Sequence, residues 1–261
     1  PPRPGRDPVT LLRGAWALLL KELQQHTIAF AVAIVFYVAF GVITVSLTLA
    51  DENGSVIDSA ANLTWWFSPL LSFFVVRRLV SLEYRHRTWE FLAALPSSAL
   101  VRAWSKFTIG IVLVTSVVVL STAAIALLGS QQELLPAGFL LLATTQIVGY
   151  TWAWYALVFL VAHVGRFRAG VWLLLLPLLT SLTEMLPGAF DDWMWHAALS
   201  RPFDETRADL PWTAIAITGL WAVGFAMAGF ALASVGRGAR VTAWFRRPLP
   251  QERAAMVVVV L

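Results

Sequence analysis

Six long stretches without a charged residue restrict the folds open to this 261-residue chain more than any other feature. A helix needs about 20 apolar residues to cross the hydrocarbon layer of a bilayer, which is about 30 Å thick. The sequence therefore predicts an all-α polytopic membrane protein with one transmembrane domain. The six predicted spans are residues 27–50, 59–76, 107–131, 134–165, 169–187 and 210–236. The fifth span has the shortest charge-free stretch, residues 169–183, which contains Pro177 and is long enough only if it continues through Glu184 towards Pro187.

Composition excludes several other classes of protein. Only 13% of the residues are charged, against about 25% in soluble domains, so most of a soluble surface is missing. The absence of cysteine excludes disulfides, thiolate metal sites and cysteine nucleophiles. The basic residues lie in short loops beside apolar stretches, a placement that reflects membrane topology and not a nucleic-acid surface.

The charge distribution predicts an orientation. All but two of the 19 Lys and Arg residues, Arg201 and Arg207, lie on the side of the membrane that also holds both termini. Lys and Arg concentrate in cytoplasmic loops, so both termini are predicted to be cytoplasmic and the chain to lie in the plasma (inner) membrane.

Residues 9–26 predict an amphipathic helix in the headgroup plane. Arg13 and Lys21 belong to its polar stripe, and Trp16 belongs to the apolar face. The alternative is a span that begins early, which Lys21 and Glu22 would make costly.

The loop after the second stretch predicts two short helices. Thr88 can cap the first, and Pro96 follows its end. This first helix is too brief to form a core, so its apolar side chains need another surface. That surface is either a protein partner or the lipid. Ser97 or Ser98 caps the second helix, which leads into the third span through Lys106. The first helix carries Trp89, Glu90, Phe91, Leu92 and Leu95.

The same loop resembles the cytoplasmic signature of type-2 ABC exporter permeases. The matching positions are Glu83, Thr88, Glu90, Leu92, Leu95, Pro96 and Lys106. The Gly that commonly precedes the Thr is Arg87 here, which changes the turn before the helix. The interfacial helix, the six spans and the cytoplasmic termini are similar too, so the resemblance covers nearly the whole chain and includes the gliding-associated branch of the family.

This resemblance implies a function. Residues 88–95 would be the coupling helix that enters a groove on a cytoplasmic ATPase subunit, and the permease would work as a homodimer or heterodimer. ATP and Mg would bind the partner, because this chain has no G-x-x-x-x-G-K-[ST] loop and is predicted to hold no cofactor and catalyse no reaction. The alternative is an ATP-independent membrane protein, either a secondary carrier or a structural anchor.

The resemblance also implies an outer gate between the fifth and sixth spans. Candidate gate residues are Glu184, Pro187, Asp191, Asp192, Trp193 and Trp195. The acids there are the pattern of a solvated face and not of a catalytic cluster. Glu184 is either an interfacial residue or an intramembrane carboxylate with a function.

The last span and the tail each leave two interpretations open. Small residues recur in the rows Ala222/Ala226 and Gly224/Ala228, which permit close helix packing within the chain or across a dimer seam. Residues 237–261 are a cytoplasmic tail or the start of a seventh span.

Overall fold

The described part of the chain is helical throughout. The computed structural model describes residues 16, 20, 24, 27–28, 30–39, 41–43, 46, 67–81, 98–129, 137–164 and 212–235. Every one of these residues except Ser98 is in a helix, and none of them is in a strand. The all-α prediction is therefore confirmed for this part of the chain.

Among the described residues, three helices are long and apolar enough to cross a membrane. They are α5 (Ala99–Gly129), α6 (Ala137–Val164) and α9 (Trp212–Val235). Their apolar portions are Ala99–Ala124, Thr144–His163 and Trp212–Ser234. These helices correspond to the predicted third, fourth and sixth spans. The first two predicted spans contain the shorter helical runs 30–39 and 67–76, and the fifth lies outside the described residues.

Helix α5 begins earlier than the predicted third span. Ser98 caps its N-terminus, because the Ser98 side-chain oxygen accepts a hydrogen bond from the Val101 amide at 3.2 Å. The Ser98 carbonyl accepts a second bond from the amide of Arg102, also at 3.2 Å. The short second helix predicted in the loop and the third span are thus one continuous helix.

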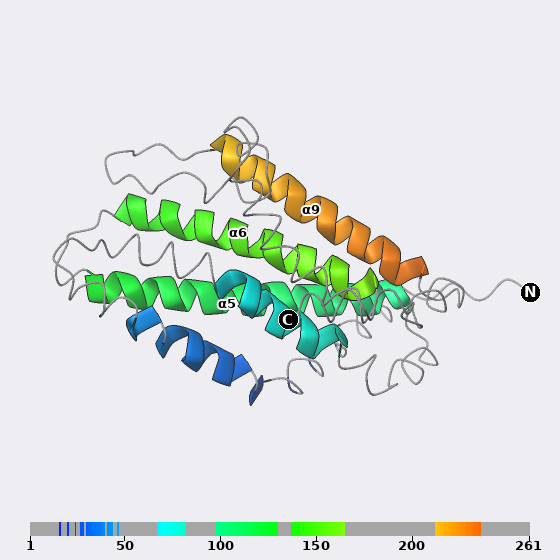
Figure 1. The fold of residues 1–261 in the computed structure, drawn as a ribbon, viewed down its shortest axis with the longest axis horizontal. Helices are drawn as coiled ribbons and strands as arrows, with labels where there is room; N and C mark the ends of the chain where they lie inside the picture. Colours follow the sequence, from blue (N-terminus) through cyan, green and yellow to red (C-terminus); the bar gives the residue numbers. More distant parts are fainter. Residues whose placement is uncertain are drawn as a thin grey trace, which may run out of the picture.

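Helix α6 lies at the centre of the described bundle, between α5 and α9 (Figure 1). It runs antiparallel to α5, since Tyr155 of α6 meets Gly110 while the earlier Trp152 meets the later Thr115. Helices α6 and α9 run in the same direction (Figure 1). The end of α6 and the start of α9 consequently lie at opposite ends of the bundle.

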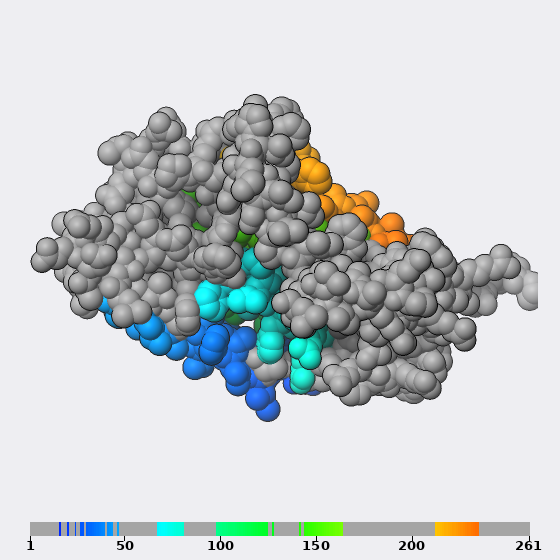
Figure 2. Space-filling view, viewed as in Figure 1, coloured from blue at the N-terminus to red at the C-terminus, as the bar shows by residue number. Residues whose placement is uncertain are grey.

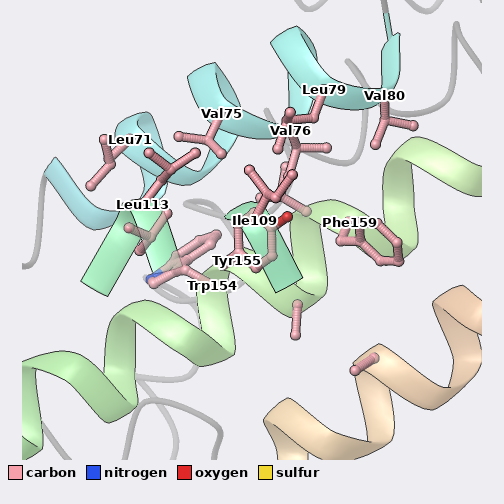
Figure 3. Packing of buried hydrophobic residues seen from close by; sticks show 14 of the residues in the cluster. Leu71, Val75, Val76, Leu79, Val80, Ile109, Leu113, Trp154, Tyr155 and Phe159 are labelled. Atoms are coloured by element: carbon pink, nitrogen blue, oxygen red, sulfur yellow. The ribbon is translucent and has the colours of Figure 1, made fainter. Parts of the chain in front are cut away.

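The helix of residues 67–76 covers α5 and α6. Its buried side chains pack against Ile109 and Leu113 of α5 and Tyr155 of α6 (Figure 3). On one face of the molecule it lies beside the helical residues 30–43 (Figure 2). Its buried apolar side chains are Leu71, Val75 and Val76.

One of the two small-residue rows in α9 packs within the chain. Ala226 is buried and Ala222 packs against the core, whereas Gly224 is exposed and a Cβ added to it would meet nothing within 4 Å. A Cβ added to Gly229 would lie 2.9 Å from Cδ1 of Phe159. The close approach of α9 to α6 therefore depends on Ala226 and Gly229.

Candidate functional site

A buried lysine connects the two helices on either side of the segment 82–97. Lys106, on the first turns of α5, is only 7% exposed although it lies within an apolar span. Its ammonium donates a hydrogen bond of 2.7 Å to the carbonyl oxygen of Leu79. The bond joins η1 to α5, the two elements that flank the segment 82–97, which carries the predicted coupling helix.

The Leu79 carbonyl can accept this hydrogen bond because it lies in the last turn of its helix. Residues 67–76 form an α-helix that continues as a π-helical turn, η1 (Arg77–Ser81). The last carbonyls of a helix have no amide partner within it, and cations are favourable at this negative end of the helix dipole. Lys106 therefore acts as a C-terminal cap supplied by another helix, and its bond is charge-assisted. The π turn also buries Leu79 and Val80 while Arg77 and Arg78 stay exposed.

An aromatic cluster joins α5, α6 and α9 next to this lysine. Its members are Trp104, Phe107, Tyr155, Phe159, His163 and Phe230. Phe107 lies at the centre, with its ring centroid 5.0 Å from Phe159, 5.2 Å from Phe230 and 5.4 Å from Tyr155. Edge-to-face and tilted aromatic pairs of this kind add about 0.5–1.5 kcal/mol each beyond the buried area. The bundle is therefore firmly packed at the end where the loop is attached.

Tyr155 connects the cluster to the backbone of α5. Its hydroxyl donates a hydrogen bond of 3.3 Å to the Lys106 carbonyl. Its ring crosses α5 at Gly110, where an added Cβ would lie 2.7 Å from Cε2 of the ring and closer still to Cζ and the hydroxyl. Only glycine leaves room for the ring, so Gly110 sets the distance between α5 and α6 beside Lys106.

All the charge in the described part of the chain lies at this end of the bundle. Four described residues are Lys or Arg, and no described residue is Asp or Glu. The four cations are Arg77, Arg78, Arg102 and Lys106. Within the same residues no three His, Asp or Glu side chains come together, so this part of the chain offers no metal site.

Most of the predicted site residues lie outside the described residues. Of the interfacial helix, Trp16 is described, and it is helical and exposed. From the loop signature, Lys106 is described. The others fall in segments that the structure does not describe: Arg13, Lys21, Glu22, Glu83, Arg87, Thr88, Trp89, Glu90, Phe91, Leu92, Leu95, Pro96, Glu184, Pro187, Asp191, Asp192, Trp193 and Trp195.

Sequence reasoning missed several residues that build the site. Lys106 was placed in the loop signature, but its burial and its bond to the Leu79 carbonyl were not predicted. A lysine directly before a charge-free stretch can lie within the membrane helix and then needs a buried partner, and this signal was present. Gly110 and Tyr155 gave no comparable signal, because glycine and aromatic residues are common in membrane helices.

Comparison with known proteins identifies no relative. No protein-family model matches the chain, and neither a curated protein nor a solved structure matches it.

Proposed function

We propose that this chain is the transmembrane permease subunit of a type-2 ABC exporter in the bacterial inner membrane. It would form a dimer with a second permease protomer and take its energy from separate cytoplasmic ATPase subunits. Residues 88–95 would be the coupling helix, and the chain would cross the membrane six times with both termini in the cytoplasm. The chain itself would bind no ATP and would contact only protein partners and lipid.

The observation that carries the proposal is the bond between the Lys106 ammonium and the Leu79 carbonyl. A coupling helix transmits the motion of an ATPase to the membrane helices only if it is rigidly connected to them. The segment 82–97 emerges from two helix ends that are tied to each other, and those ends are packed on the aromatic cluster. A displacement of the segment would therefore move span two and α5 together.

The direction of the helices supports the six-span topology. The end of α6 and the start of α9 lie at opposite ends of the bundle, and a fifth span within residues 165–211 would connect these two ends (Figure 1). The four described cations gather at the end where the segment 82–97 is attached. Under the positive-inside rule this end is cytoplasmic, where an ATPase would be.

Transport would follow from rigid-body motion. Two ATPase subunits that close on ATP would bring the two coupling helices together, and each helix would move its bundle. This requires that the open and closed states differ in their contacts with the ATPase, because a ligand shifts an equilibrium only through such a difference.

The test is purification of the tagged full chain from its own membranes in mild detergent. We expect an ATP-hydrolysing subunit with a phosphate-binding loop to co-purify at a fixed stoichiometry. Trp89→Ala and Glu90→Arg should each remove that subunit while the chain still inserts in the membrane.

The matched control is Trp212→Ala, an exposed tryptophan at the opposite end of the bundle, which should keep the subunit. A wild-type chain that brings no ATPase, or variants at 89 and 90 that retain it, would overturn the proposal and favour an ATP-independent carrier or anchor.

A further inference from the structure

Four polar side chains on the helix of residues 67–76 and on α6 are buried. Ser68, Ser72, Gln146 and Thr151 are all at most 3% exposed. The oxygens of Ser68 and Thr151 are 2.9 Å apart, so one hydrogen bond joins the two helices. We define these four residues as the polar seam.

Hydrogen-bond directions in the seam leave it rich in acceptors. The Thr151 hydroxyl donates its one proton to the Ile147 carbonyl at 2.7 Å, so Ser68 must donate to Thr151. The Ser72 hydroxyl and the Gln146 carbonyl oxygen have no hydrogen-bond partner at all. A polar group left unpaired at membrane depth costs several kcal/mol.

The unpaired state of Ser72 is unusual within the described helices. Seven other Ser and Thr hydroxyls donate to the carbonyl one turn earlier, at 2.7–2.9 Å. Ser72 makes no such bond, so its proton and its lone pairs are free for a third group. Ser105 is the useful contrast, because it is equally buried and is satisfied by the Val101 carbonyl.

Register identifies the neighbours of the two unpaired groups. The helix of residues 67–76 and α6 run in the same direction, with Ser68 opposite Thr151 (Figures 1 and 3). One turn further along, Ser72 and Tyr155 therefore lie at the same level. On the other side of the Ser68–Thr151 pair, Gln146 is one turn before Tyr150 on α6.

Open space borders α6 three residues beyond Gln146. Gly149, three residues later on the same side of α6, is only half-buried, and an added Cβ there would meet nothing within 4 Å. Gln146 thus presents an unpaired acceptor beside a position without a side chain.

We propose that the polar seam holds bound water, with one site at the Ser72 hydroxyl and another at the Gln146 carbonyl oxygen. Water fits because it can both donate and accept, and buried waters in proteins make about 3 hydrogen bonds to otherwise unsatisfied groups. A cation is disfavoured, since the described residues include no carboxylate and the buried charge of Lys106 lies at the end of the same helix pair. This inference does not depend on the proposed transport function.

Radiolytic hydroxyl footprinting of the full chain in lipid nanodiscs, in water enriched in oxygen-18, tests the proposal. Tyr155 and Tyr150 are at most 1% exposed, so water within the protein is the only nearby source of label. We expect both rings to incorporate oxygen-18. Ser72→Ala should lose the label at Tyr155, and Gln146→Leu should lose it at Tyr150, while Ser105→Ala keeps both.

Thermal unfolding gives a second, independent measurement. If water occupies the site, Ser72→Ala breaks a satisfied network and lowers the Tm; if the site is dry, removal of an unpaired hydroxyl raises the Tm. Unlabelled tyrosines in the wild type, a label at Tyr155 that survives Ser72→Ala, or a raised Tm would each overturn the proposal. Labelling that changes when sodium replaces a bulky organic cation would also overturn it, because the occupant would then be an ion.

Discussion

Gly110→Ala should destabilise the bundle, although alanine is the better helix former. The new methyl group would overlap the ring of Tyr155, which is fully buried and therefore has nowhere to move. Overpacking of this kind costs about 1–3 kcal/mol. A displaced ring would also lose its bond to the Lys106 carbonyl, which adds about 0.5–1.5 kcal/mol. The higher helix propensity of alanine offsets about 1 kcal/mol of this loss in unfolding free energy.

The expected net loss is about 2 kcal/mol of unfolding free energy. It can be measured by titrating detergent-solubilised protein with SDS and following the fluorescence of the 13 tryptophans. Gly219→Ala is the matched control, since Gly219 is exposed and an added Cβ there meets nothing within 4 Å. That variant should be neutral or slightly stabilised.

A double mutant separates a local clash from a general effect of the substitution. The Tyr155 hydroxyl is the atom nearest to the added methyl group, so Tyr155→Phe should recover part of the stability lost in Gly110→Ala. The close packing of α5 on α6 at this point is wrong if Gly110→Ala is as stable as Gly219→Ala. It is also wrong if the effects of Gly110→Ala and Tyr155→Phe on the unfolding free energy are additive.

Two further substitutions probe other contacts. Lys106→Met should keep the packing of the lysine stem but release the Leu79 carbonyl. The distance between spin labels at Ala93→Cys and Ser234→Cys should then become more widely distributed. An unchanged distribution would show that the bond does not hold the loop. The absence of native cysteine makes this labelling specific. Gly229→Val should lower the unfolding free energy by about 1–3 kcal/mol, because its side chain meets α6. Gly224→Val on the open face should not, and equal losses in these two variants would contradict the α6–α9 packing.

Local features of the fold were predictable from the sequence. Hydropathy located α5, α6 and α9, because a membrane helix needs a continuous apolar stretch and charges mark its ends. Ser98 was one of two predicted caps, and the cap signal is local as well. The rows Ala222/Ala226 and Gly224/Ala228 were both predicted to permit close packing, and the structure places Ala222 and Ala226 in or against the core but leaves Gly224 exposed.

The site was less predictable, because its contacts join residues far apart in the chain. Lys106 bonds a carbonyl 27 residues earlier, and Tyr155 bonds a carbonyl 49 residues earlier. Periodicity reports which side of a helix is apolar, but most faces of these helices are apolar, so it does not determine which helix packs on which. The contact of the Tyr155 ring with Gly110 forms only when α5 and α6 pack against each other.

The π turn at Arg77–Ser81 makes the direction in which the chain leaves the helix of residues 67–76 depend on a single residue. A π turn closes its hydrogen bond across one residue more than an α turn, so it behaves as a one-residue insertion. Each residue of an α-helix rotates the chain by about 100°, and deletion of one residue here would rotate everything that follows by that angle. Leu79 would then leave the core, its carbonyl would turn away from Lys106, and the loop would face another side of the bundle. Insertions and deletions at this turn should therefore be far rarer among relatives than substitutions at the exposed arginines within it.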